Sequence, residues 1–572
     1  MTKRRLKYVA DVETTVDRED CRVWGFGIMN VFNTKSYAIG NDINEMMRMF
    51  ERVKADVYFH NLRFDGSFIV NWLYRNGYEY SETPAANTFN TTISKFNQWY
   101  KIQVVYDTDN NGRPIHTTFY DSLKKLPFRV SQIADMYGLD HKKGEIDYEA
   151  YRAPGHEITR EERSYIYNDI KIMADALRLQ FKEGLVSMTA GADALKNFKQ
   201  MITSKAFDTY YPKLSMVIDD DIRKSYKGGF TWLNPTFKDK EIGAGLTFDV
   251  NSLYPYIMYD RDLPYGVPVY FKGRYEYDDR HPLYIQHIKI NFDIKEGCVP
   301  TIQIKKSLMF SDTEYLNSSD GYDVDLYVTN VDLELIKSHY HIHHIEYLSG
   351  WKFKKVNGVF HDYIDKWMEI KSTHDGGMRV LAKLMLNSLY GKFATNPLME
   401  SKIPILNLEG TLQMIDGEPS EKDPVYTAMG VFITSYARDY MIRTAQKVYP
   451  RLIYCDTDSL HLVGTEMPDA IKDIVDDNKL GYWDFEMEFT RAKYLRSKSY
   501  IQAVKDDDVE KLRRKGILNT HDLKVTVAGL TEDIRDDVTF DNFKTGLKLN
   551  GKLMPVQVPG GIVLEPTTFT IN

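Results

Sequence analysis

One stretch of the chain alternates short apolar runs with acidic residues. The apolar run 452–454 leads into Asp456 and Asp458, and a second apolar run, 460–463, leads out. Both runs are short and rich in strand-favouring residues, so the pattern predicts a β-hairpin with the acidic residues at its tip. Two carboxylates one residue apart on an extended chain share one side and repel each other unless a divalent cation lies between them. A solvated acidic turn is the alternative that this stretch leaves open.

A similar pattern recurs in the first third of the chain. Predicted strands at residues 6–10 and 57–59 run into acidic residues, and a predicted helix opened by residues 159–162 carries two polar side chains four positions apart. Such groups can hold two metal ions that stabilise the attacking and leaving oxygens of phosphodiester hydrolysis. Each site by itself is more often an ordinary polar surface. The candidates are four carboxylates and a phenol that would orient water: Asp11, Glu13, Asp65, Asp169 and Tyr165.

Two further patterns lie beyond the first third of the chain. The run 246–250 predicts a strand that delivers Asp249 to a turn. Residues from about 378 to Gly391 predict a helix with a leucine-rich core face, Leu384, Leu386 and Leu389. Cations and an aromatic ring on its other face suit a triphosphate and a base, although a solvated helix face is the simpler interpretation. That face comprises Arg379, Lys383, Asn387 and Tyr390.

Composition narrows the function classes. At 572 residues the chain can hold about four domain-sized units. A net charge of −7 is unusual for a nucleic-acid-binding protein, but local basic grooves set the field that a strand meets. The three cysteines are far apart, which predicts a reducing compartment without a disulfide framework or zinc knuckle. No apolar run is long enough for a signal sequence or membrane span, so we expect no membrane partner.

The order of these motifs resembles that of family B DNA polymerases. The carboxylates of the first third, with the Tyr165-x3-Asp169 spacing, resemble the family's 3′–5′ exonuclease motifs. Residues 249–255 read D-x2-S-L-Y-P and residues 454–458 read Y-x-D-T-D, which are motifs A and C, and residues 383–391 resemble motif B. Two added segments, about 261–358 and 397–421, resemble those of the protein-primed branch found in small Bacillus phages (the phi-29 type).

The resemblance implies a multidomain protein of α+β and α/β class, with an RNase H-like exonuclease domain joined to a right-hand polymerase that carries two insertions. The implied division is exonuclease 1–189, palm 190–260 and 423–530, first insertion (terminal-protein region 1) 261–358, fingers 359–394, second insertion (terminal-protein region 2, strand displacement) 395–422 and thumb 531–572.

The resemblance also implies metal and nucleotide ligands. Each active site would hold two Mg²⁺ ions, with Mn²⁺ able to substitute. The polymerase ligands would be Asp249, Asp458 and the Val250 carbonyl, with Asp456 nearby, and the exonuclease ligands Asp11, Glu13, Asp65 and Asp169. Lys143 would assist the exonuclease leaving group, or it is a solvated turn residue. Tyr254 would reject a 2′-hydroxyl, and the other nucleotide ligands would be Lys371, Arg379, Lys383, Asn387 and Tyr390.

The implied DNA ligands fall into three groups. Single-stranded DNA would meet Thr14, Asn61, Phe64, Ser122 and Leu123, with Lys124 and Lys125 available for phosphates. A linker motif would meet the template through Tyr226, Gly228 and Gly229. The primer or template would meet Thr434 and Arg438, and also Lys498 and Tyr500, which we expect to alternate on a strand. Matches of lower weight for primer, terminal-protein or nucleotide contacts are Lys305, Asp332, Lys366 and Lys371.

Two segments outside these motifs carry structural predictions. His339, His341 and His343 alternate on a predicted strand and could bind zinc, but a solvated strand is the preferred interpretation because no second shell is evident. The second insertion should form a hairpin-like loop between 403–406 and the run at Val425, with Gly410, Gly417 and Pro419 as its turns. We expect it to project before a strand region at Thr434, close against residues 556–563, and admit only one DNA strand.

The resulting hypothesis is a monomeric, protein-primed, processive and strand-displacing DNA-dependent DNA polymerase with proofreading. It would replicate a linear phage-type genome in the cytoplasm of an infected bacterium, and its partners would be template, primer, dNTPs and a terminal protein. Two alternatives are a DNA-processing 3′–5′ exonuclease and a non-enzymatic DNA or terminal-protein clamp. Intact Asp249, Asp456, Asp458 and Lys383 argue against the first, and carboxylates at two sites argue against the second.

Overall fold

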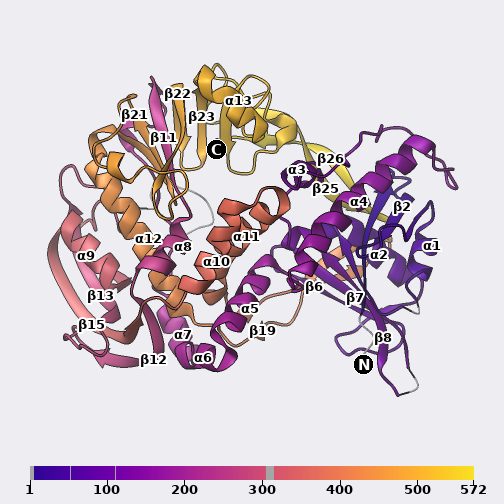
Figure 1. Cartoon of the computed structure of the whole chain (residues 1–572), viewed down its shortest axis with the longest axis horizontal. Coiled ribbons are helices and arrows are strands. Elements are labelled where there is room, and N and C mark those ends of the chain that lie inside the picture. Colours follow the sequence, from indigo (N-terminus) through magenta and orange to yellow (C-terminus); the bar gives the residue numbers. More distant parts are fainter. Residues whose placement is uncertain (1–4, 52, 110, 305–314) are drawn as a thin grey trace.

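The protein is seen in a computed structural model that describes residues 5–51, 53–109, 111–304 and 315–572. Figure 1 shows an N-terminal sheet on one side, a central sheet on the other, and a helical pair between them. Among the described residues, no helix has both the length and the apolar character required to cross a membrane.

The N-terminal sheet has eight strands. Their spatial order is β3 (Tyr37–Gly40), β2 (Val23–Asn30), β1 (Leu6–Thr14), β4 (Ala55–Phe59), β8 (Pro114–Asp121), β7 (Trp99–Thr108), β6 (Thr88–Ile93) and β5 (Glu79–Tyr80). Helix α2 (Leu62–Arg75) packs on the face that holds Val57 and Phe59, and helix α4 (Arg160–Lys182) packs on the opposite face, beside Tyr58. The strands predicted at 6–10 and 57–59 and the helix after Thr159 are confirmed.

The central sheet also has eight strands. Its path is β24 (Leu523–Val527), β23 (Ser499–Val504), β22 (Trp483–Arg496), β11 (Gly245–Val250), β21 (Ser459–Val463), β20 (Leu452–Asp456) and β9 (Thr231–Leu233), with β10 (Glu241–Ile242) beside β22. The predicted hairpin is the β20–β21 pair. Helices α8 (Leu253–Asp260) and α12 (Thr427–Lys447) pack together in the core that supports this sheet. Thr434 lies within α12, so the expected strand region there is wrong.

A helical pair, α10 (His361–Thr373) and α11 (Gly376–Phe393), lies between the two sheets (Figure 1). Helix α11 continues two residues past Gly391, where the sequence pattern placed its end, because Phe393 is fully buried against the rings of Phe207 and Tyr211. Other helices are α1 (Ile43–Arg48), α3 (Val130–Met136), α5 (Ala190–Ile202), α6 (Ser204–Tyr210), α7 (Met216–Arg223) and α13 (Asp506–Arg514).

The first added segment forms a sheet of its own at one end of the molecule (Figure 1). Its strand order is β12 (Leu263–Lys272), β15 (Tyr340–Val356), β13 (Leu283–Ile294) and β14 (Val324–Thr329), followed in sequence by α9 (Asn330–His339). His339 is the buried last residue of α9 and bonds the Val299 carbonyl, so the three histidines do not alternate on one strand as expected. His343 and His344 pair with separate carboxylates, Asp293 and Asp323.

The second added segment forms a hairpin. Strand β17 (Lys402–Leu406) pairs with β18 (Leu412–Asp416), while β16 (Leu398–Met399) pairs with β19 (Ser420–Glu421). The predicted partner at Val425 is therefore wrong. Of the three expected turn residues, Gly410 lies at the tip between β17 and β18, whereas Gly417 and Pro419 follow β18. The turn falls early because Asn407 bonds the Glu409 and Thr411 amides and closes a short loop.

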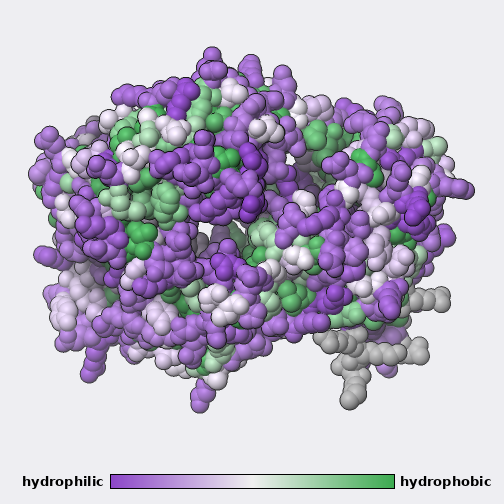
Figure 2. Space-filling view, turned by 45° about the horizontal axis from the view of Figure 1, so that its top comes forward, coloured by the Kyte–Doolittle hydropathy of each residue, from purple (hydrophilic) through white to green (hydrophobic). Residues whose placement is uncertain are grey.

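The hairpin tip packs where the sequence predicted contact. Leu412 is 2 % exposed and belongs to the core cluster of the N-terminal sheet, together with Val558 and Val563 of the C-terminal hairpin β25 (Lys548–Val558) and β26 (Gly561–Thr570). The Asn71 amide donates to the Gly410 carbonyl at 3.1 Å, and the Tyr74 hydroxyl donates to the Pro404 carbonyl at 2.8 Å. Figure 2 shows the surface deeply hollowed near the centre of the molecule.

Candidate active sites

The central sheet brings two half-buried carboxylates together. Asp249 of β11 lies opposite Ser459 of β21, and the Val250 amide donates to the Asp458 carbonyl at 2.8 Å. Burial and the neighbouring Asp458 raise the pKa of Asp249 to about 8, and burial and Asp456 raise the pKa of Asp458 to about 6. Like charges held this close favour binding of a divalent cation. Both carboxylates and the Val250 carbonyl therefore suit such an ion chemically.

Asp456 has a different environment from its two neighbours. Lys498 donates to both of its oxygens, at 2.6 and 2.7 Å, and the Tyr454 hydroxyl and Thr231 also bond it. A carboxylate already neutralised in this way is a structural anchor for the hairpin tip. Its placement near the other two agrees with the expectation that it stands beside the metal ligands.

Lys498 and Tyr500 do not alternate on a strand as predicted. Lys498 has φ 57° in the turn before β23, so it is free to bend back to Asp456. Tyr500 is 7 % exposed and packs against Tyr454 and Tyr494. The two side chains therefore do not point the same way, as the alternation implied. Lys498 bonds Asp456, and Tyr500 packs within the aromatic core.

Three cationic side chains of the helical pair, Lys371, Arg379 and Lys383, form a cluster on the side of the carboxylates. Lys371 Nζ donates to Asn251 Oδ1 at 2.6 Å and to Ser252 Oγ at 3.1 Å, and Arg379 donates to the Lys371 carbonyl at 2.6 Å. Burial, Lys383 and Arg379 lower the pKa of Lys371 to about 8, and burial and Arg379 lower that of Lys383. Cations that destabilise one another in a half-buried site favour an anionic ligand. Asn387 is exposed on the same helix.

An aromatic stack lies near Asp458. Tyr254 of α8 stacks on Tyr390 of α11 with ring centroids 4.0 Å apart. Burial and the nearby Tyr390 raise the pKa of Tyr254, so its phenol stays neutral at physiological pH. The stack places one flat, uncharged surface near Asp458.

The linker motif is held from inside the protein. A Cβ on Gly229 would lie 2.8 Å from Thr457, so glycine permits the loop to approach the acidic hairpin. Arg438 donates to the carbonyls of Lys227 and Gly228 at 3.0 and 2.9 Å. Tyr226 is half-buried beside them.

Thr434 and Arg438, which were predicted to contact the primer or template, are buried in this structure. They are 1 and 2 % exposed, and the Thr434 hydroxyl bonds the Gly430 and Val431 carbonyls of its own helix. Arg438 pairs with Asp332 of α9 at 2.8 Å. Both side chains point into the protein because Asp332 and the helix carbonyls satisfy their polar groups. Lys366 is exposed on α10, and Lys305 lies outside the described residues.

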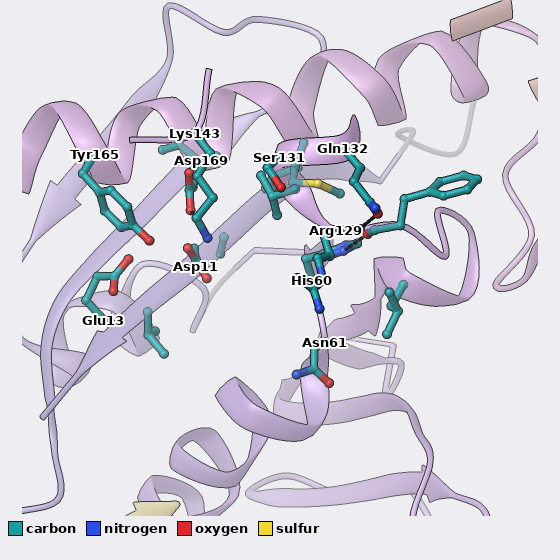
Figure 3. Close-up of a pocket in the computed structure, with 18 of the residues that line it drawn as sticks. Asp11, Glu13, His60, Asn61, Arg129, Ser131, Gln132, Lys143, Tyr165 and Asp169 are labelled. Atoms are coloured by element: carbon teal, nitrogen blue, oxygen red, sulfur yellow. Dashed lines mark hydrogen bonds and ion pairs between the residues drawn. The ribbon is translucent and has the colours of Figure 1, made fainter. Parts of the chain in front are cut away.

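The N-terminal sheet carries the second cluster, in a cavity of about 1020 Å³ (Figure 3). Asp11 and Glu13 come from β1, and Tyr165 and Asp169 come from α4 and face them. Asp65 of α2 accepts a hydrogen bond from the Val12 amide of β1 at 3.2 Å. All five side chains predicted from the sequence therefore gather at one place.

The cluster is strongly acidic and buried. Burial and the charge of Asp169 raise the pKa of Asp11 to about 7, and burial first of all raises the pKa values of Glu13, Asp65 and Asp169. Asp169 Oδ1 is buried without a hydrogen-bond partner. Cations would relieve both conditions, so the donor set fits divalent metal chemically. As placed, no three acidic, imidazole or thiol groups of the described chain converge on a single metal position.

Lys143 faces this cluster and is not a solvated turn residue. Its Nζ lies 3.3 Å from Asp169 Oδ2 and 5.8 Å from the centre of the Tyr165 ring. Tyr148, which sequence reasoning missed, places its hydroxyl 2.6 Å from that of Tyr165. No motif marks Tyr148, because it lies in an irregular segment whose position depends on tertiary contacts.

Predicted single-strand ligands divide into two groups. Asn61 is exposed with φ 74°, and it lines the cavity together with Leu123. Thr14 and Phe64 are half-buried and do not line the cavity. Ser122 is 1 % exposed, and its hydroxyl bonds the Phe59 carbonyl and His60, so its side chain does not reach the cavity.

Ser122 and Lys125 were both expected to contact DNA, but each bonds to groups inside the protein. Lys125 is fully buried and pairs with Asp193 and the Leu185 and Ser187 carbonyls, so it cannot meet a phosphate. His60, which carried no prediction, bonds the Phe128 carbonyl at 2.7 Å and lines the cavity.

The fold and the two sites define a nucleic-acid polymerase with an associated nuclease. Residues 46–477 match the family described as DNA polymerase type B, organellar and viral, and the chain belongs to that family. The DNA polymerase of Bacillus phage phi29 is 54 % identical over 571 residues, which cover 99 % of each chain.

Solved structures agree over the full length. Phi29 DNA polymerase complexed with single-stranded DNA has a TM-score of 0.92 and 51 % identity. The same polymerase complexed with primer-template DNA and incoming nucleotide substrates has a TM-score of 0.93 and 52 % identity. Both cover 100 % of each chain. The predicted fold, an exonuclease domain joined to a polymerase, is confirmed, and the chain is a DNA polymerase with an associated 3′–5′ exonuclease.

Proposed function

We propose that the chain is a protein-primed, strand-displacing and processive DNA polymerase that replicates a linear phage genome in the cytoplasm of an infected bacterium. The observation that carries the proposal is the pairing of Asp249 and Asp458 near the cations Lys371, Arg379 and Lys383. This arrangement suits transfer of a nucleotide from a bound triphosphate to a primer hydroxyl, with pyrophosphate leaving. Template, primer and dNTPs are the partners that this chemistry requires.

In the polymerase site, Asp249, Asp458 and the Val250 carbonyl would hold two Mg²⁺ ions, with Mn²⁺ able to substitute. When bound, the ions supply charge stabilisation for the entering and leaving oxygens. Lys371, Arg379 and Lys383 bind the triphosphate oxygens and release their mutual repulsion in doing so. Tyr254 and Tyr390 close the sugar side, and Asn387 lies on the face of α11 where the nascent pair would rest.

In the exonuclease site, Asp11, Glu13, Asp65 and Asp169 would hold the metal ions. Tyr165 orients the attacking water through its hydroxyl, which the Tyr148 hydroxyl fixes at 2.6 Å. Lys143 stands beside Asp169, where it can stabilise the leaving oxygen. Asn61 and Leu123 line the approach and would meet the single strand.

A terminal protein would supply the priming hydroxyl, and a single chain of the polymerase would act with it. The support is the resemblance of both added segments to those of the protein-primed branch, together with the contact of the β17–β18 hairpin with the N-terminal core. By this contact the hairpin would close a ring around DNA. Such a ring retains DNA without relying on charge, which suits a chain with net charge −7.

The test is one labelled primer on a template with a downstream duplex, incubated with Mg²⁺. With dNTPs, the primer should be extended through the duplex without a helicase, and without dNTPs it should shorten from its 3′ end. Shortening without any extension would favour the alternative of a processing exonuclease. Binding without either reaction would favour a clamp.

A further inference from the structure

The segment between α3 and α4 carries two groups of the exonuclease site but has no helix or strand at residues 139–159. Lys143 lies beside Asp169, and the Tyr148 hydroxyl bonds that of Tyr165. Groups on irregular backbone need supporting contacts to hold a productive geometry. The question is therefore which contacts fix this segment.

An ion pair anchors the far end of the segment. Arg152 Nε lies 2.7 Å from Glu162 Oε1, and the two side chains are 6 and 9 % exposed. The guanidinium also lies over Trp24, with its central carbon 4.2 Å from the centre of the ring. Arg152 NH1 donates to the Ala150 carbonyl at 2.9 Å, and Arg22 donates to the Arg152 carbonyl.

Glu162 binds the segment through a second group of contacts. His156 Nε2 lies 2.8 Å from Glu162 Oε2, and the Thr159 amide donates to the same oxygen at 3.0 Å. The last contact completes the capping box that starts α4. Arg152, His156 and the amide together hold the pKa of Glu162 at about 2 although burial opposes this, so the carboxylate is ionised at any working pH.

This anchor is continuous with the reacting groups. Glu162 precedes Tyr165 by three residues and Asp169 by seven, so all three lie along one face of α4. Trp24 forms one buried cluster with Tyr165 and Ile166. Trp24 also precedes Gly25, which pairs with Glu13 in the sheet.

We propose that Arg152 and Glu162 are positioning residues of the exonuclease reaction. The pair holds the segment so that Lys143 and Tyr148 meet Asp169 and Tyr165. Removing either partner leaves the other buried charge without its ion-pair partner and with only its weaker contacts, which favours release of the segment over retention of its position. The inference rests on the proposed exonuclease roles of the acidic cluster.

The experiment measures 3′–5′ degradation of a labelled single-stranded oligonucleotide with Mg²⁺, primer extension, and hydrogen exchange of residues 139–159. Arg152→Met and Glu162→Gln should each lower the exonuclease kcat about tenfold to a hundredfold, the scale of a small misplacement of catalytic groups. KM should stay within about twofold, because Asn61 and Leu123 still line the cavity. Primer extension should be unchanged, and exchange in the segment should rise.

Two variants serve as controls. Lys142→Met removes the exposed pair with Asp135 in the same segment, with partners 60 and 72 % exposed, and should match the parent protein in every measurement. Arg152→Lys keeps the charge but loses the guanidinium that lies over Trp24, so it should restore part of kcat.

An unchanged exonuclease kcat in both Arg152→Met and Glu162→Gln would overturn the inference. Equal losses of extension and degradation would overturn it too, since they would show a general structural role. Asp11→Ala with Glu13→Ala is the reference. If that variant still degraded DNA, the proposed site itself would fail together with the inference, whereas its inactivity beside a fully active Arg152→Met would reject the inference only.

Discussion

The phenol rings of Tyr254 and Tyr390 stack at a centroid distance of 4.0 Å with 24° between their planes. Tyr254 belongs to the first turn of α8, five residues after Asp249, and Tyr390 belongs to the last turns of α11. The stack therefore joins the central sheet to the helical pair beside the carboxylates. In the proposed polymerase site, this stack is the group that would exclude an added hydroxyl on a nucleotide sugar.

Nucleotide choice should depend on this stack. Tyr254→Val removes the ring and should admit ribonucleotides, shifting selectivity by about 1–3 kcal/mol, which is roughly 10–200-fold. Tyr390→Phe retains a stacking ring and should leave selectivity near the parent value. The measurement is kcat/KM for dGTP against GTP, and an unchanged ratio in Tyr254→Val would reject the role.

Triphosphate binding should weaken as the pH rises through about 8. The pKa of Lys371 is lowered to about 8 by burial, Lys383 and Arg379, so the lysine is charged below that pH and neutral above it. In the parent protein, KM for dNTP should rise between pH 7 and 9. Lys371→Gln should raise KM about tenfold or more at pH 7, the value of a charged hydrogen bond, and flatten this rise.

Lys366 provides the control for that titration, because it is exposed on the same helix. Lys366→Gln should keep the pH dependence of the parent. A profile in Lys371→Gln that still bends near pH 8 would assign the titration to another group.

The β17–β18 hairpin should retain DNA by enclosure. Replacing residues 401–421 with a short Gly-Ser linker removes the Leu412 contact with the N-terminal core and opens the ring. Single-nucleotide addition should remain largely intact, because the hairpin contributes no group to the Asp249 site. Products made under excess trap DNA should shorten, and synthesis through duplex should stop. Full-length products on a primed circle under trap would contradict enclosure.

The Asp332–Arg438 pair should stabilise the junction of α9 with α12. Burial would raise the pKa of Asp332, but Arg438, Lys227 and Ser435 outweigh it and hold the pKa below its ordinary value. The stabilisation is thus present above about pH 4 and is lost as the pH falls through the folded-state pKa. Asp332→Asn should cost about 3–5 kcal/mol near pH 7, since Arg438 remains buried and unpaired.

Thermal unfolding of Asp332→Asn at several pH values tests this. The midpoint should fall near pH 7, and its difference from the parent should shrink below pH 4. Asp439→Asn, in the more exposed pair with Arg443 of the same helix, should cost less than about 1 kcal/mol. Equal midpoints for the parent and Asp332→Asn at pH 7 would contradict the account.

Local patterns predicted much of the structure. The acidic hairpin, the strand that ends at Asp249 and the helix opened by Thr159 all depend on neighbouring residues, and all were predicted correctly. The larger architecture came from motif order, because no periodicity indicates how two sheets and a helical pair are arranged.

Long-range contacts account for the positions at which the structure differs from the sequence patterns. Arg438 looked like a DNA ligand, but its partner Asp332 is 106 residues away and buries it. Lys498 looked like a strand residue, yet Asp456, 42 residues earlier, holds it in a turn. Ser122 and Lys125 are likewise satisfied inside the protein. A polar residue in a motif reaches the surface only if it does not bond to an internal partner distant in the sequence.

The central claim is that the two carboxylate clusters are separate active sites in separate domains. Primer extension and primer shortening, measured on the same labelled primer for two folded variants, test it most directly. Asp11→Ala with Glu13→Ala should abolish shortening and leave extension nearly intact, and Asp458→Asn should abolish extension and leave shortening. Loss of both activities in either variant would contradict the account.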